Sequence, residues 1–111
     1  MSLYIEHPIT GEQIQVAIND FPNEMTWHLA MSACEGLGKG WRLPIKEELS
    51  VMYEQLHKQG KGNFKTVNEE SYWSSSQYYT DSAFKVSLGS GSVDVSKKSN
   101  YFHVRAVRTL S

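Results

Sequence analysis

Apolar and polar residues alternate along two stretches near the start of the chain, residues 3–6 and 12–18. A period of two places successive side chains on opposite faces of a strand. Pro8 and Gly11 lie between the two stretches, where a reversal of the chain is needed. The pattern therefore predicts an N-terminal β-hairpin with one apolar face.

Two later segments have the three- and four-residue spacing of amphipathic helices. Thr26 is placed to act as the N-cap of the first helix, and Gly38 and Gly40 follow its end. The second helix is expected to begin just after Pro44 and to end at Gly60. The predicted buried positions are Trp27, Ala30, Met31, Cys34 and Leu37 in the first helix, and Leu49, Met52, Tyr53 and Leu56 in the second.

The pattern returns to a period of two after a long loop at residues 57–70. Residues 84–88 and 93–96 alternate around Gly-Ser-Gly at 89–91, which predicts a hairpin with one buried face. A last strand is expected from 101 to 108, with Phe102, Val104 and Ala106 on one face and Tyr101, His103 and Arg105 on the other. Two helices followed by an antiparallel meander predict a single α+β domain over residues 1–111.

The charge balance is close to neutral, with 11 Lys and Arg against 12 Asp and Glu among 111 residues. No global field would draw the protein to nucleic acid or to an anionic membrane. No apolar run approaches the ~20 residues that span a bilayer, and the first residues lack the regions of a signal peptide. We expect no membrane insertion and a cytoplasmic or virion-associated protein, unless residues 1–3 replace a removed signal.

Catalytic chemistry finds little support in the sequence. Cys34 is the single cysteine and lies in the first helical pattern, so we expect a buried thiol and no disulfide within the chain. The four histidines show no metal-ligand spacing, and the serines at 74–76 lack the setting of a nucleophile elbow. We predict a non-enzymatic protein with no cofactor and no metal.

Three short runs combine large apolar side chains with polar or charged ones: Trp-Arg-Leu-Pro at 41–44, Tyr-Trp-Ser-Ser-Ser at 72–76 and Val-Arg-Ala-Val-Arg at 104–108. Their arginines could bind an anion, but arginines beside apolar strands more often pair with carboxylates, here those at the start of the second helix. We interpret as structural anchors Trp41, Arg42, Pro44, Glu47, Glu48, Trp73, Arg105 and Arg108.

In order and spacing, these runs and the residues between them resemble the Lcl C-terminal domain family over residues 24–108. This family is a bacterial and phage branch of the C-type-lectin-like fold, related in architecture to sulfatase-modifying-factor domains. The resemblance implies two helices flanking a twisted antiparallel sheet whose N- and C-terminal strands pair. It also implies binding rather than catalysis, commonly at a cell or virion surface.

The sequence departs from the family in one local feature and lacks the chemistry of two functional relatives. Ile45 stands where the family usually has Thr or Ser, so we expect a less firmly capped second helix. Oxygen ligands for calcium are sparse around Asp81, Asp94 and Asn100, which predicts calcium independence. The cysteines that formylglycine-generating relatives use near their C-terminus are absent.

The candidate ligand-binding residues are Tyr78, Tyr79, Asp81, Tyr101 and His103, because folding explains this polar, tyrosine-rich surface least. Tyrosine combines large contact area with a polar tip, which suits recognition. The expected ligand is a glycan or a protein. The alternative is that these tyrosines pack beneath the long loop.

Two other functions remain open from the sequence. A basic patch at Lys58, Lys61 and Lys65, joined by lysines 97 and 98, could bind a sulfated polysaccharide. A structural or virion-decorating protein would instead use the exposed tyrosines as the interface of a homo-oligomer.

Overall fold

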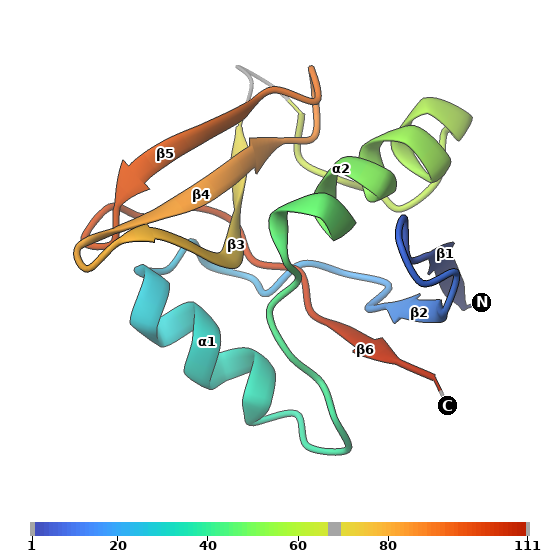
Figure 1. The fold of residues 1–111 in the computed structure, drawn as a ribbon, viewed down its shortest axis with the longest axis horizontal. Helices are drawn as coiled ribbons and strands as arrows, with labels where there is room; N and C mark the ends of the chain where they lie inside the picture. The colour runs from blue at the N-terminus through green and yellow to red at the C-terminus, as the bar shows by residue number, and fades with distance from the viewer. Residues whose placement is uncertain (1, 67–69, 111) are drawn as a thin grey trace.

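The computed structural model describes residues 2–66 and 70–110 and confirms an α+β fold (Figure 1). Its regular elements are two helices, one short 3-10 helix and two three-stranded antiparallel sheets. In chain order they are β1 (Leu3–Glu6), β2 (Gln13–Val16), α1 (Trp27–Glu35), α2 (Lys46–Gln55), η1 (His57–Gln59), β3 (Ser71–Tyr79), β4 (Ser82–Ser87), β5 (Val93–Lys97) and β6 (Val107–Thr109).

The first sheet has the strand order β1-β2-β6 and confirms the N-terminal hairpin. Leu3 pairs with Val16 and Ile5 with Ile14, and these four side chains are buried, as the alternation predicts. The C-terminal strand β6 pairs with β2, the second strand of the hairpin, rather than with β1. The family's pairing of N- and C-terminal strands is thus present, but through β2.

The second sheet has the order β3-β4-β5, so the fold contains two sheets where we expected one. Gly91 in the β4–β5 connection has φ of +80°, and a Cβ there would lie 2.9 Å from the ring of Tyr53. Glycine therefore satisfies both the backbone conformation and the packing of this turn. The returning strand is more open than predicted, since Val93 is 46% exposed and pairs only with β4.

Both helices have the predicted spacing of buried residues, but their ends differ from those expected from the sequence. Thr26 occupies the N-cap position of α1 but its side chain makes no capping hydrogen bond. Leu37 lies beyond the end of α1 and is 48% exposed, so it is not part of the core. Helix α2 ends before η1, and Gly60 closes η1 in the left-handed conformation. None of the helices in the described residues is long and apolar enough to cross a membrane.

The predicted last strand is wrong for most of its length, because only residues 107–109 form a regular strand. Residues 102–106 instead run as an extended segment between the loop that precedes α1 and the start of β3. Its backbone bonds to Phe21 and Met25 on one side and to Trp73 on the other. Neighbouring chain covers both faces, so alternation fails and residues 104–107 are all buried.

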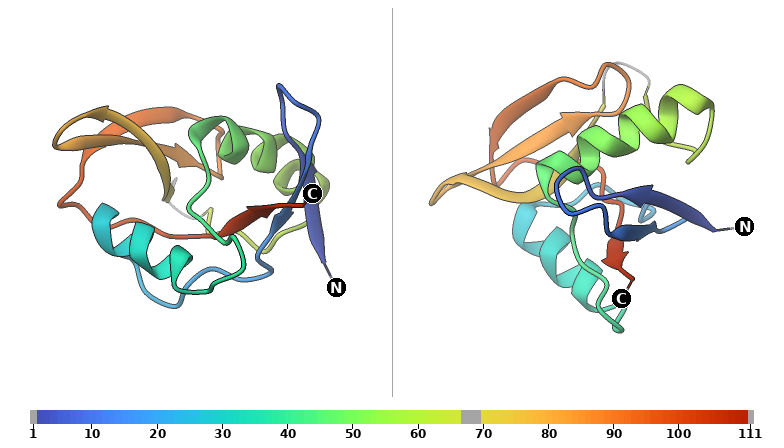
Figure 2. Two further views of the ribbon diagram at one scale, coloured as in Figure 1. Left: turned by 60° about the horizontal axis from the view of Figure 1, so that its bottom comes forward. Right: turned by 45° about the vertical axis from the view of Figure 1, so that its right-hand side comes forward.

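This segment, called the central segment below (residues 102–106), separates two groups of buried side chains. One group joins the first sheet and α2 to Tyr72 of β3, and the other joins α1 to Trp73. Figures 1 and 2 show the segment passing through the middle of the molecule, with α1 and α2 on opposite sides. The core therefore consists of two clusters of buried side chains, and Val104 and Ala106 of the central segment belong to the cluster that joins α1 to Trp73.

Candidate binding surface

Two of the predicted structural anchors, Arg42 and Glu48, connect the chain that precedes helix α2 to the start of that helix. Arg42 makes two hydrogen bonds of 2.8 Å to the carboxylate of Glu48, a buried side chain on the first turn of α2. The same carboxylate accepts a hydrogen bond from the backbone N–H of Ile45. Glu48 therefore links the Trp-Arg-Leu-Pro run to the helix start, as the sequence suggested.

The other two arginines do not pair with the helix glutamates, contrary to our expectation. Arg105 is fully buried and donates to Asp20 at 2.7 Å, because its side chain leaves the central segment toward the loop before α1. Arg108 donates to Gln15 across the β2–β6 pair and lies over the Trp41 ring. Each arginine is used within the fold, on a different partner.

The hydroxyl missing at Ile45 is supplied from another part of the chain. Ser76 Oγ accepts a hydrogen bond of 3.0 Å from the N–H of Lys46, the first residue of α2. The carbonyl of buried Pro44 accepts another from Ser75 N–H. The expected weakness of this cap is therefore compensated by β3, and no local pattern marks this contact, since Ser76 lies 30 positions from Lys46.

All three candidate tyrosines are exposed, which excludes the alternative that they pack beneath the long loop. Tyr78 is 64% exposed, Tyr79 72% and Tyr101 61%. Tyr78 rests edge-on against Phe84 with ring centroids 5.6 Å apart, so its ring is held while most of it faces solvent. Tyr78 and Tyr79 end strand β3, and exposed Asp81 lies in the turn that follows.

Lys98 fixes this turn, although the sequence placed it with a solvent-facing basic patch. It is 8% exposed, and its ammonium donates to Gln77 at 2.6 Å and to the carbonyl of Thr80 at 2.9 Å. The ammonium also lies 4.2 Å from the centre of the Trp27 ring. Lys98 is therefore engaged inside the fold and is not available to a polysaccharide.

A concave region of about 550 Å³ adjoins the turn and brings together side chains from three parts of the chain. Its lining consists of Thr26, His28, Thr80, Asp81, Lys97, Lys98 and Ser99. Hydroxyl, carboxylate, imidazole and ammonium groups can all hydrogen-bond to a polar ligand. This region, together with Tyr78, Tyr79 and Tyr101, is called the tyrosine surface below.

His103 does not join the tyrosine surface. The backbone of the central segment places it against the start of β3, where its ring lies 5.5 Å from that of Tyr72. Tyr72 and Tyr78 are six residues apart on one strand, so the two places lie at most about 20 Å apart, and less where the register shifts between Trp73 and Gln77 bend the strand. The ring nitrogen Nε2 of His103 lies 3.0 Å from a carboxylate oxygen of Glu70 and 3.7 Å from one of Glu24.

Of the predicted basic patch, Lys58 is already paired. Its ammonium lies 3.3 Å from Glu54 and 5.6 Å from the centre of the Tyr53 ring. Lys61 and Lys65 are exposed. The pairing of Lys58 weakens the local positive potential, which a sulfated chain would need.

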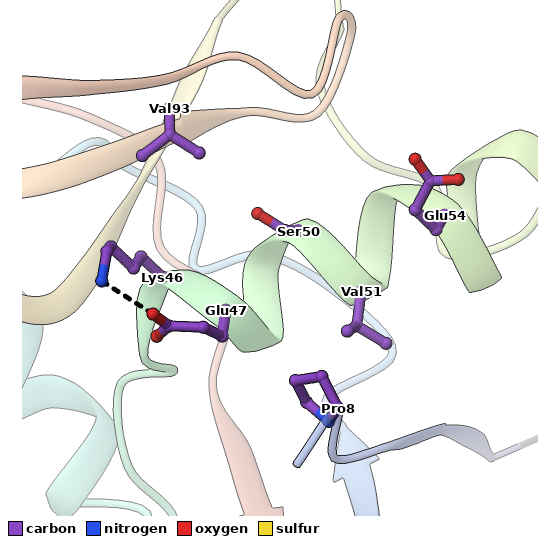
Figure 3. Close-up of a pocket in the computed structure, with 7 residues that line it drawn as sticks. All are labelled: Pro8, Lys46, Glu47, Ser50, Val51, Glu54 and Val93. Atoms are coloured by element: carbon purple, nitrogen blue, oxygen red, sulfur yellow. Dashed lines mark hydrogen bonds and ion pairs between the residues drawn. The ribbon is translucent and has the colours of Figure 1, made fainter.

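A second concave region, of about 360 Å³, lies along α2 between the β1–β2 turn and the start of β5. Figure 3 shows Lys46, Glu47, Ser50, Val51 and Glu54 along the helix, with Pro8 on one side and Val93 on the other. The hydrogen bond from Lys46 lowers the pKa of the Glu47 carboxyl. Since Glu54 is paired with Lys58, both carboxylates here already have a cation beside them.

A comparison with known protein families gives a match over most of the chain. The model of the Lcl C-terminal domain family matches residues 10–108, a longer stretch than the one on which the sequence resemblance rested. A search of curated proteins finds none that matches this chain.

Proposed function

Since the chain belongs to the Lcl C-terminal domain family, we propose that it is a non-enzymatic binding module that recognises a glycan through the tyrosine surface. The observation that carries this proposal is the exposure of Tyr78, Tyr79 and Tyr101, each more than 60% accessible. Packing in the core does not account for three aromatic rings that are mostly exposed, so we assign them a role in binding.

The surroundings of the tyrosines favour a sugar over a protein partner. Gln77, Thr80, Asp81 and Asn100 are neighbours of the tyrosines along the chain, so polar groups are available close to the rings. The centre of a stable protein interface is depleted of charged residues and largely apolar, which residues of this kind do not favour. A sugar presents apolar C–H faces and hydroxyl groups together, and both can be matched by rings set among hydrogen-bonding groups.

The surface is also prepared for binding before a ligand arrives. Lys98 ties the β3–β4 turn to the N-terminal end of α1, because its backbone bonds to both Asp81 and Trp27. A turn held in one conformation loses less entropy on binding than a mobile one. The concave region of about 550 Å³ is of a size that holds a small ligand.

The proposal includes no reaction and no calcium. Ser74 and Ser76 use their hydroxyls in hydrogen bonds to the Phe84 carbonyl and from Lys46. Asp94 accepts a hydrogen bond from its neighbour Val95, and Asn100 donates to Ser96. These groups are thus already engaged in local hydrogen bonds.

A glycan-array screen of the full chain, with and without added calcium, tests the proposal. We expect one class of glycan to be retained without calcium, and Tyr78→Ala or Tyr101→Ala to weaken its binding about 10-fold, the loss of one aromatic contact. Tyr4→Ala is the matched control, since Tyr4 is 41% exposed on β1, in the other sheet.

Retention that survives both substitutions would contradict the assignment of the site. An array without any retained glycan, combined with concentration-dependent light scattering that Tyr79→Ala abolishes, would show that the tyrosines form an oligomer interface instead.

A further inference from the structure

Three side chains outside the tyrosine surface converge on one point although they are distant in sequence. They are Glu24 in the loop before α1, Glu70 just before β3, and His103 in the central segment. One oxygen from each carboxylate and the Nε2 of His103 all lie within 4.8 Å of one another. No spacing rule could have found them, because the chain separates Glu24 from Glu70 by 46 positions (70 minus 24).

The backbone fixes the three positions relative to one another. Met25 and Phe102 exchange two hydrogen bonds of 2.9 and 3.1 Å, which holds Glu24 beside the central segment. His103 donates its N–H to Ser71 and accepts from Trp73, which holds it beside the strand that follows Glu70. Backbone hydrogen bonds between neighbouring segments therefore hold the three residues near one another.

The hydrogen-bonding capacity of the cluster is incomplete as it stands. A neutral imidazole has one N–H, so Nε2 can donate to one carboxylate at a time. It lies 3.0 Å from Glu70, which leaves Glu24 at 3.7 Å with no other polar partner among the described residues. Two carboxylates thus face the same nitrogen, and a cation placed among the three would satisfy all of them.

We propose that Glu24, Glu70 and His103 bind a divalent transition-metal ion, with zinc the ion that fits this donor set. Ligand atoms bonded to a tetrahedral zinc ion at about 2.0–2.2 Å lie about 3.3–3.6 Å apart. The two distances to Nε2, 3.0 and 3.7 Å, are within about 0.3 Å of this range. An imidazole nitrogen disfavours calcium and magnesium, which take oxygen ligands. Glu24 is 46% exposed, so its side chain is free to move toward an ion placed between the other two ligands.

The remaining coordination positions can be filled by water. His103 lines a cavity of about 330 Å³ together with Asp20, Asn63 and Lys65. Asp20 itself is bound to Arg105 and Tyr72, so it stays a neighbour and not a ligand. An ion at this site would join the loop before α1, the start of β3 and the central segment, and would stabilise the folded chain by binding it alone.

Calorimetric titration of the untagged, metal-free full chain with zinc chloride tests the site. We expect one zinc per chain, no displacement by millimolar calcium, and a rise of at least about 4 °C in the thermal midpoint. Cobalt in place of zinc should give the visible absorption of an ion with nitrogen and oxygen ligands.

Glu24→Gln is the informative variant, because it removes one ligand from a half-exposed side chain and should leave the metal-free midpoint unchanged. We expect it to weaken zinc binding at least about 10-fold. The matched control is Glu35→Gln, an exposed carboxylate at the end of α1, and His28→Gln controls for binding to an exposed histidine.

Zinc binding that is unchanged in both Glu24→Gln and His103→Gln would overturn the proposal, as would an absence of stoichiometric binding or displacement by calcium. None of these readouts uses a glycan, so they are independent of the binding function proposed above.

Discussion

The two ends of strand β3 have opposite surroundings. At its start, residues 71–74 are buried between the central segment, α1 and β4, and their polar atoms are bonded. At its far end, residues 77–79 are exposed and touch little beyond β4 and the ammonium of Lys98. One continuous strand thus supplies the core with Tyr72 and Trp73 and the surface with Tyr78 and Tyr79.

This difference teaches that aromatic residues of similar type serve stability or recognition according to what covers them. The ring nitrogen of Trp73 donates to the Met25 carbonyl at 2.8 Å, and its ring meets Phe102 edge-on at 4.9 Å. Tyr79, six positions later, has no such cover and is 72% exposed. Each prediction below changes one end or the middle of β3, or a residue in contact with it or in the same buried cluster, and compares the effects.

The largest expected effect is at the buried end. Trp73→Ala should lower the free energy of unfolding by about 4 kcal/mol, because it leaves a large cavity in the core. Tyr79→Ala should change it by less than about 0.5 kcal/mol. Urea unfolding followed by circular dichroism measures both, and equal losses would refute the contrast between the two ends.

The ion pair beneath the start of β3 should rank next. Asp20→Ala leaves the fully buried Arg105 without its carboxylate, which should cost about 3 kcal/mol. Asp81→Ala, an exposed carboxylate at the far end, serves as the control and should cost less than about 0.5 kcal/mol. Replacing Arg105 by Met in the Asp20→Ala background should restore part of the loss, and no recovery would mean that the arginine is not the cause.

The middle of β3 should show a smaller effect through helix α2. Ser76→Ala removes the acceptor for the N–H of Lys46 and should destabilise the protein by about 1 kcal/mol. Ser75→Ala is the neighbouring control, because Ser75 contributes its backbone N–H to Pro44 and keeps it. Equal denaturation midpoints of the two variants would rule out capping by Ser76.

The smallest expected effect concerns the buried hydroxyl of Tyr72 and the buried thiol of Cys34. It is a loss of stability that appears only at alkaline pH. Burial raises the pKa of the Tyr72 hydroxyl above its ordinary value of 10.0, and its hydrogen bond to Asp20 acts in the same direction. Burial also raises the pKa of the Cys34 thiol from 9.0 to about 12. In the unfolded chain both groups lose their protons at lower pH. Their contribution to stability should therefore be constant below about pH 9, and stability should fall as the pH rises above it.

Unfolding by urea at several pH values between 8 and 11 measures this slope. Cys34→Ala should make the decline above pH 9 shallower, whereas Tyr79→Ala should leave it unchanged. A decline of the same steepness in Cys34→Ala would assign the alkaline effect to other groups.

Local patterns in the sequence were sufficient for most of the fold. The alternation at Ile5, Ile14 and Val16 and the helical spacing at Ala30 and Cys34 record which face of each element avoids water, so the hairpin and both helices were predicted correctly. The pairing of Arg42 with a glutamate of α2 was also predicted, because six residues separate it from Glu48.

The pattern failed where a strand has protein on both faces. Val104 through Val107 are all buried, so the segment carries no alternation that marks one side. The arginine there was assigned to the glutamates of α2, because its actual partner, Asp20, lies 85 positions earlier in the chain. The same reason hid the contact of Ser76 with α2, 30 positions away.

The sequence by itself determined the N-terminal hairpin, both helices and the likeness to the Lcl C-terminal domain family, and it singled out the tyrosines at 78, 79 and 101. Only the tertiary structure decided that His103 leaves those tyrosines for Glu24 and Glu70, and that Lys98 turns inward beneath the β3–β4 turn. The physical reason is that hydrophobic periodicity acts between near neighbours along the chain. Ion pairs and metal ligands depend on distances in space, which exist only after the central segment has joined the two sheets.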